Sequence, residues 1–175
     1  EALARSSEAR PLSAIRAIGF RTIVIREYGR IIRIWAQTLV PSAVTTTLYF
    51  VIFGSLVGRR IGAMGGHDYI AYIAPGLIMM AVITNSYGNV VSSFFGAKFG
   101  KHIEELLVAP LPAWAIVLGY VGGGLVRGLL VGIVVTAVTL FFTHLHVEHP
   151  LIVASSVVLT AIVFSLGGFI NAVFA

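Results

Sequence analysis

Residues 113–143 read AWAIVLGYVGGGLVRGLLVGIVVTAVTLFFT, an apolar run of 31 residues in which Arg127 is the only charged side chain. About 20 apolar residues suffice for a helix to cross the hydrocarbon core of a bilayer, so the run predicts a transmembrane helix that is tilted or begins at the membrane interface. Three glycines recur at every fourth position, Gly124, Gly128 and Gly132. This spacing is typical of a helix face that another helix backbone approaches closely, and it predicts interhelical packing there.

The rest of the chain has the composition of a membrane protein. Of its 175 residues, 58% are hydrophobic and 11% are charged, whereas a soluble domain carries about 25% charged residues. The mean hydropathy is +0.97. The absence of cysteine excludes a disulfide framework, a thiol nucleophile and thiolate metal ligands. We therefore expect an all-α polytopic membrane protein, with a transmembrane domain over 34–175 and spans near 34–58, 70–95, 113–143 and 151–175.

The residues before the first span have the periodicity of a basic amphipathic helix. At 100° per residue, four arginines fall on one side, and aromatic and aliphatic residues fall opposite them. Such a helix is suited to the headgroup layer of a membrane, although a helix packed on a partner or on its own bundle shows the same pattern. We expect residues 1–33 to form a cytoplasmic tail and an amphipathic interfacial helix. The basic side consists of Arg16, Arg26, Arg30 and Arg33, and the aromatic and aliphatic side consists of Phe20, Val24, Tyr28, Ile31 and Trp35.

The distribution of lysine and arginine outside the spans predicts the orientation of the chain. Cytoplasmic segments of membrane proteins carry an excess of these residues. If the N-terminus is cytoplasmic, the inside segments hold nine of them and the outside loops hold only Arg59 and Arg60. The N-terminus and the segment 96–112 are therefore expected in the cytoplasm. The nine lysine and arginine residues of the inside segments are Arg5, Arg10, Arg16, Arg21, Arg26, Arg30, Arg33, Lys98 and Lys101.

Three polar residues within the predicted spans are candidates for lining a substrate path: Asn85, Asn89 and Arg127. Polar side chains in a span usually face protein or water, so the two asparagines either make interhelical hydrogen bonds or line the path. Arg127 needs a partner because a charge at that depth costs a few kcal/mol. No acid lies in another span, so we expect the partner to be backbone carbonyls, a lipid headgroup, a second subunit or a missing segment.

The segment 96–112, between the second and third spans, turns hydrophilic. Ile103, Leu106 and Leu107 recur at i, i+3 and i+4, which predicts a short amphipathic helix. The helix follows Gly100, and the prolines after it prevent its extension. A solvated loop is the alternative. The residues of this segment that we expect to contact a partner are Lys101, Ile103, Glu104, Glu105, Leu106, Leu107 and Pro110.

Four motifs follow one another along the chain: Arg26-Glu27-Tyr28, Tyr69 through Pro75-Gly76-Leu77, Ile103–Leu111, and Gly119-Tyr120 with Gly124 and Arg127. Together they resemble the ABC type-2 permeases, the membrane subunits of ABC exporters, over nearly the whole chain. The segment 103–111 is similar to the cytoplasmic coupling helix that contacts the ATPase subunit of those permeases. The resemblance implies a homodimeric permease of the bacterial inner membrane, with ATP and magnesium bound by a separate ATPase. It also implies that the chain is the first part of a six-span permease, truncated after the fourth span.

Motifs for catalysis or metal binding are absent from the sequence. The stretch Gly96–His102 resembles a phosphate-binding loop, but it has three residues between its glycines instead of four and a histidine in place of Ser or Thr. The loop 144–150 has three histidines and a glutamate, yet nothing fixes a third metal ligand, and a polar turn ended by Pro150 is expected. The net charge is +5, and the basic residues that cause it lie beside apolar runs. This arrangement favours membrane lipid over nucleic acid as a partner.

The sequence thus predicts a transport subunit, not an enzyme, which exports a lipid-, polysaccharide- or drug-like substrate with a separate ATPase. Two alternatives remain open. An ion-coupled or passive transporter would require an ionisable path, for which Arg127 alone is thin evidence. A non-transporting membrane scaffold is also compatible with the sequence. Co-purification with an ATPase distinguishes the first hypothesis from the other two.

Overall fold

The computed structural model describes residues 12–61, 63–64, 67–101, 103–104, 108, 111–143 and 149–175. Within these ranges the protein is mainly helical, with one hairpin of two short strands, and four helices are long and apolar enough to cross a membrane. The prediction of an all-α polytopic membrane protein with four spans is therefore confirmed. The four helices cover Trp35–Gly54, Tyr69–Phe99, Ala113–Phe142 and Pro150–Phe174.

The order of the elements follows the alternation of apolar runs and turns in the sequence. Pro112 directly precedes one long helix and Pro150 begins another, positions where the missing N–H of proline has no intrahelical partner to lose. The strands β1 (Ala63–Met64) and β2 (His67–Asp68) pair antiparallel. The helices are α1 (Leu12–Arg33), α2 (Trp35–Val51), the π-helical η2 (Ile52–Val57), α3 (Gly58–Ile61), α4 (Tyr69–Phe99), α6 (Ala113–Phe142) and α7 (Pro150–Phe174).

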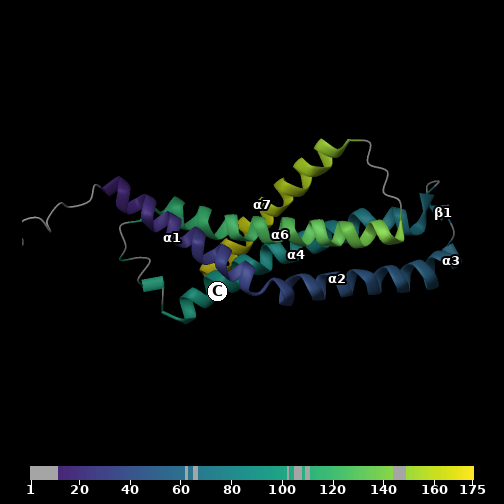
Figure 1. Cartoon of the computed structure of the whole chain (residues 1–175), viewed down its shortest axis with the longest axis horizontal. Coiled ribbons are helices and arrows are strands. Elements are labelled where there is room, and N and C mark those ends of the chain that lie inside the picture. The colour runs from purple at the N-terminus through teal and green to yellow at the C-terminus, as the bar shows by residue number, and fades with distance from the viewer. Residues whose placement is uncertain are drawn as a thin grey trace, which may run out of the picture.

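Helices α4 and α6 form the centre of the molecule and run antiparallel, side by side (Figure 1). Helix α2 runs along one side of this pair, and α1 lies over the N-terminal part of α6. Helix α7 crosses the pair at an angle, so that its C-terminal half packs on α4 while its N-terminal end lies away from the bundle. The end of α4, the start of α6 and α1 therefore meet at one end of the molecule, opposite the hairpin.

The three glycines spaced four apart on α6, here called the glycine ladder, are buried in the contact with α4. A Cβ atom on Gly128 would overlap Ser86 Oγ. A Cβ atom on Gly124 would lie 2.5 Å from both Val90 Cγ2 and Ser165 Oγ, the latter on α7. The helices approach this closely because glycine has no side chain to hold them apart. The facing residues of α4 are Val82, Ser86 and Val90, which are also spaced four apart.

One face of α1 packs on the bundle. Ile23 and Ile31 are buried, and a Cβ atom on Gly119 of α6 would overlap the side chain of Ile23. Glu27, halfway between the two isoleucines, is also buried, with 3% of its surface exposed. Residues four apart lie along one stripe of a helix. The docked stripe of α1 therefore contains a carboxylate among apolar residues.

The arginines of α1 do not share one outer side, contrary to the prediction from periodicity. Arg26 and Arg33 are exposed, but Arg30 is half-buried and directed toward α4. The prediction is wrong for Arg30 because its orientation depends on a partner in α4, which helical periodicity does not reveal. On the side predicted to be apolar, Tyr28 and Trp35 are exposed. The side chain of Arg16 lies outside the described residues.

Candidate functional site

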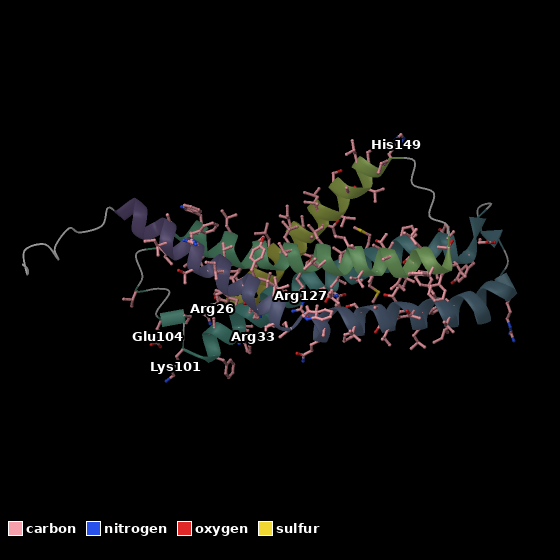
Figure 2. All side chains as sticks on the ribbon, in the orientation of Figure 1. Arg26, Arg33, Lys101, Glu104, Arg127 and His149 are labelled. Carbon is pink, nitrogen blue, oxygen red and sulfur yellow. The ribbon has the colours of Figure 1, made fainter. Side chains whose placement is uncertain are left out.

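The segment between α4 and α6 begins with an abrupt change of direction. The N–H of Gly100 donates to the carbonyl of Gly96 at 2.9 Å, which closes the last turn of α4. Lys101 then has a φ of 57°, in the left-handed region that residues other than glycine rarely adopt. The chain therefore leaves the axis of α4 at this point. Figure 2 shows Lys101 and Glu104 together at this end of the molecule, and both are exposed.

Ile103 and Glu104 are consecutive helical residues whose side chains have different surroundings. Ile103 is half-buried and packs against the core cluster, a group of buried residues from α4, α6 and α7. Glu104 is exposed, and so is Val108, to 86% of its surface. The segment thus contacts its own bundle through Ile103 and presents other residues outward. The core cluster consists of Val90, Phe94, Tyr120 and Ala172.

The described part of the segment covers only some of the residues predicted to couple to an ATPase. The sequence places Ile103 on one apolar stripe with Leu106 and Leu107, for contact with a partner. In the structure Ile103 faces the bundle instead. Whether the stripe contacts a partner stays a prediction. The residues of this set that lie outside the described part of the chain are Glu105, Leu106, Leu107 and Pro110.

A partly buried ionic cluster joins α1, α4 and α6 beside the glycine ladder. It consists of Glu27 and Arg30 of α1, Asn89 and Ser93 of α4, and Arg127 of α6. Arg30 Nη2 donates to Glu27 Oε2 at 3.0 Å, and Ser93 Oγ donates to Glu27 Oε1 at 2.6 Å. Arg30 Nη2 also donates to Asn89 Oδ1 at 2.9 Å. Arg127 Nη1 donates to the same oxygen at 3.1 Å.

The partner of Arg127 differs from every partner predicted from the sequence. Among the described residues its acceptor is the side chain of Asn89, which the prediction did not include. The prediction is wrong because it considered only acids inside the spans. A neutral amide oxygen is the acceptor, and the nearby carboxylate belongs to Glu27, which precedes the first span. The available signal was the spacing of Glu27 and Arg30, three apart on one helix face.

The ionic cluster contains two guanidinium groups and one carboxylate. Both guanidinium groups donate to one oxygen, Asn89 Oδ1, and therefore lie close to each other. Three further donors of the cluster are buried without a partner among the described residues: the Nε atoms of Arg30 and Arg127, and Asn89 Nδ2. An unsatisfied buried donor costs about 1–3 kcal/mol. The cluster is thus rich in positive charge and in donors, and Glu27 is its only anion.

A groove with a volume of about 250 Å³ lies between α2 and α4. Most of its exposed surface is apolar, but it is called the polar groove here because hydroxyl and amide side chains line it. Asn85 lines it, and its Nδ2 donates to the carbonyl of Ala81 at 2.9 Å and to Ser42 Oγ at 3.4 Å. Ser42, Thr46 and Thr84 also line it, and their hydroxyls donate to carbonyls four residues earlier. Of the three predicted path residues, only Asn85 lies in this groove. The other lining residues are Pro41, Thr45, Tyr49, Leu77, Met80 and Ala81.

The histidine loop predicted to be a polar turn lies mostly outside the described residues. Among those that the structure does describe, no group of three or more His, Cys, Asp or Glu side chains is placed to hold a metal ion. The candidate functional features among the described residues are therefore the segment after α4, the ionic cluster and the polar groove.

Comparison with known proteins gives one family. The sequence profile of the family described as "ABC-2 type transporter" matches residues 18–175. The chain is 58% identical to the protein named "Inner membrane transport permease YadH" in Escherichia coli K12, in Escherichia coli O157:H7 and in Shigella flexneri. Each alignment covers 90% of this chain and 62% of the relative, so the chain spans less than two thirds of the length of these proteins. No solved structure matches the chain.

Proposed function

Because the chain belongs to the ABC-2 type transporter family, we propose that it is the permease subunit of an ABC exporter in a bacterial inner membrane. It crosses the membrane several times with its N-terminus in the cytoplasm, and it pairs with a second copy. A separate ATPase subunit binds ATP and magnesium and drives the export of a lipid-, polysaccharide- or drug-like substrate. The names of the relatives and the four apolar helices support the location, and the lysine and arginine distribution supports the orientation.

The observation that carries this proposal is the two-sided segment between α4 and α6. A permease without its own nucleotide site must receive work from an ATPase through a mechanical contact. Lys101 and Glu104 are exposed for such a contact, and charged residues at an interface set register and specificity more than affinity. Ile103, on the inner side, packs on the core cluster of α4, α6 and α7. A displacement of the segment would therefore be passed to three spans at once.

Two changes in this segment, a charge reversal and a new charge on the predicted apolar stripe, are each expected to abolish ATPase association and transport while the permease still inserts into the membrane. The variants are Glu104→Lys combined with Glu105→Lys and, separately, Leu106→Asp, which places a charge on the predicted apolar stripe. The measurements are co-purification with the cognate ATPase and ATP-driven flux in membrane vesicles. We expect association to fall at least about tenfold, which corresponds to roughly 1.4 kcal/mol.

The matched control is Asp68→Lys, a charge reversal of an exposed acid in strand β2 of the hairpin, at the opposite end of the molecule. It should leave both association and flux unchanged. Full association and full ATP turnover in the Glu104/Glu105 and Leu106 variants would show that the segment is a solvated loop and that the ATPase docks elsewhere.

The polar groove between α2 and α4 is the proposed place of substrate contact. Hydroxyl and amide groups in a span usually face protein or water rather than lipid. Ser42, Thr46 and Thr84 already donate their hydroxyl protons to the backbone, so their oxygens can act only as acceptors, and Ser42 Oγ already accepts one bond from Asn85 Nδ2. Asn85 adds a further acceptor, its side-chain oxygen, while its Nδ2 already donates to Ser42 Oγ and to the carbonyl of Ala81. The groove therefore favours a substrate that donates hydrogen bonds.

Replacing Asn85 with leucine is expected to reduce flux about tenfold without reducing ATPase association, because it removes one acceptor worth about 1–1.5 kcal/mol from the groove. The control is Thr136→Val on α6, which removes a hydroxyl that faces the α6–α7 side instead. Flux at several substrate concentrations separates weaker binding from slower turnover. Normal flux in Asn85→Leu would remove the groove from the path.

The outer face of α1 is the proposed contact with membrane lipid. Arg21, Arg26 and Arg33 are exposed on it, and Ile25 and Ile32 lie between them with 57% and 70% of their surfaces exposed. Arginines beside exposed aliphatic residues suit the boundary between anionic headgroups and acyl chains. Helix α1 would then contact lipid on one side and the bundle on the other.

A further inference from the structure

We infer that Glu27 is a positioning residue: its carboxylate holds α1 on α4 and α6, and docked α1 in turn sets the position of the first span. The part of this inference that concerns transport rests on the function proposed above. The part that concerns docking rests only on the contacts of the ionic cluster, so the two can fail separately.

The surroundings of Glu27 differ from those of the other acids that the structure describes. Asp68 and Glu104 are exposed, whereas Glu27 is buried and both of its carboxylate oxygens accept hydrogen bonds. A Cβ atom on Gly123 of α6 would lie 3.0 Å from Glu27 Oε2, so a larger residue there would crowd the carboxylate. A buried carboxylate with charged and neutral donors contributes more than an exposed ion pair.

The charge of the cluster explains why docking depends on this carboxylate. Without it, Arg30 and Arg127 would face each other across the amide oxygen of Asn89 with no anion beside them. Like charges repel strongly where the surroundings are shielded from water. Arg127 lies in the middle of a span, but Arg30 lies on α1, which precedes the spans. The repulsion would therefore be relieved by α1 moving off the bundle.

Docked α1 determines where the first span begins, because Ile34 is the only residue between the end of α1 at Arg33 and the start of α2 at Trp35. Helix α2 contacts α6 extensively but touches α4 at only a few positions. The width of the polar groove between α2 and α4 is therefore set partly through α1. Release of α1 should change how the groove holds a substrate, not only how stable the protein is.

A cysteine pair can measure α1 docking directly, because the chain has no cysteine of its own. A Cβ atom on Gly119 would lie 3.4 Å from Ile23 Cβ, near the Cβ–Cβ spacing of about 3.8 Å in a disulfide. The reference protein carries Ile23→Cys and Gly119→Cys. The initial rate of disulfide formation in membranes, followed by loss of thiol labelling with a maleimide, reports the fraction of time that α1 is docked.

In the reference protein, Glu27→Gln is expected to lower the initial rate of disulfide formation about fivefold or more, because it removes a buried charged hydrogen bond. Asp68→Asn, the same change at an exposed acid whose side chain makes no capping bond, should leave the rate within about twofold. Adding Arg127→Gln to Glu27→Gln removes one of the two facing cations and should restore the rate to within about twofold of the reference. A merely structural role for Glu27 does not predict this rescue.

The outcomes separate docking from transport. An unchanged disulfide rate in Glu27→Gln overturns the docking role, and a lowered rate that Arg127→Gln does not restore overturns the charge explanation. In the protein without the two introduced cysteines, Glu27→Gln should raise the substrate concentration for half-maximal flux about fivefold, and ATPase association should be unchanged. If the unaltered permease shows no ATP-driven flux with its ATPase, the proposed function fails, and the disulfide rates still decide the role of Glu27.

Discussion

Leucine in place of Gly128 is expected to prevent α4 and α6 from packing and to remove most of the folded protein from the membrane. Even a Cβ atom at this position would overlap Ser86 Oγ and lie 3.3 Å from the backbone oxygen of Val82. A backbone oxygen cannot move aside as the end of a flexible side chain can. Overpacking of this kind costs about 3 kcal/mol or more. The measurement is the yield of monodisperse protein in detergent and its unfolding midpoint, which should fall by roughly 10 °C.

The matched control is Gly122→Leu on the same helix, where an added Cβ would meet nothing within 4 Å. Because leucine favours helix more than glycine does, this variant should be as stable as the unaltered protein or slightly more stable. A second test uses a smaller change: Gly128→Ala should be destabilising, and Ser86→Ala should relieve part of the loss by removing the overlapping oxygen. Equal stability of Gly128→Leu and Gly122→Leu would contradict the packing described for the ladder.

Arg127→Leu is expected to leave membrane insertion intact or improve it, and to reduce flux at least about tenfold. Arginine at the centre of a span costs about 2.5–3.5 kcal/mol on insertion scales, and Arg127 lies midway along α6. Without it, Asn89 Oδ1 still accepts a hydrogen bond from Arg30, and Glu27 and Arg30 form a neutral pair. The fold should therefore tolerate the loss, so a charge kept at this cost is expected to serve transport.

The readouts are the amount of inserted protein and ATP-driven flux per inserted molecule. The control Arg60→Leu removes an exposed arginine beside the hairpin, outside the candidate spans, and should leave flux unchanged. Normal flux in a correctly folded Arg127→Leu protein would mean that the arginine serves only packing, and the transport role would be withdrawn.

The spans and their closest contact could be predicted from the sequence because they depend on local patterns. Runs of about 20 or more apolar residues can only be satisfied as helices in a bilayer. Glycine spacing marks the helix face that is able to approach another backbone. In the structure Gly124, Gly128 and Gly132 are buried against α4, although the sequence alone does not say which helix they meet.

The ionic cluster could not be predicted, because it joins residues that are distant in the sequence. Arg30 and Asn89 are 59 positions apart, and Ser93 is 66 positions from Glu27. Helical periodicity tells which residues of α1 share a side, but not which side meets the bundle. The same limit applies to Ile103, whose periodicity with Leu106 suggests an outward stripe, whereas its inward direction depends on the aromatic residues of the core cluster.

The residues that meet where the glycine ladder of α6 contacts α4 have very few internal torsions. The glycine ladder has none in its side chains, and Val82, Ser86 and Val90 have one freely rotating heavy-atom torsion each at most. Ordering a long side chain costs up to about 2 kcal/mol of rotamer entropy, whereas glycine has no side chain to order. In a bilayer, where apolar groups gain little by leaving lipid, a contact that loses so little entropy can be both close and stiff. The α4–α6 pair is thus suited to be the rigid part of the protein, against which α1 and α2 can move.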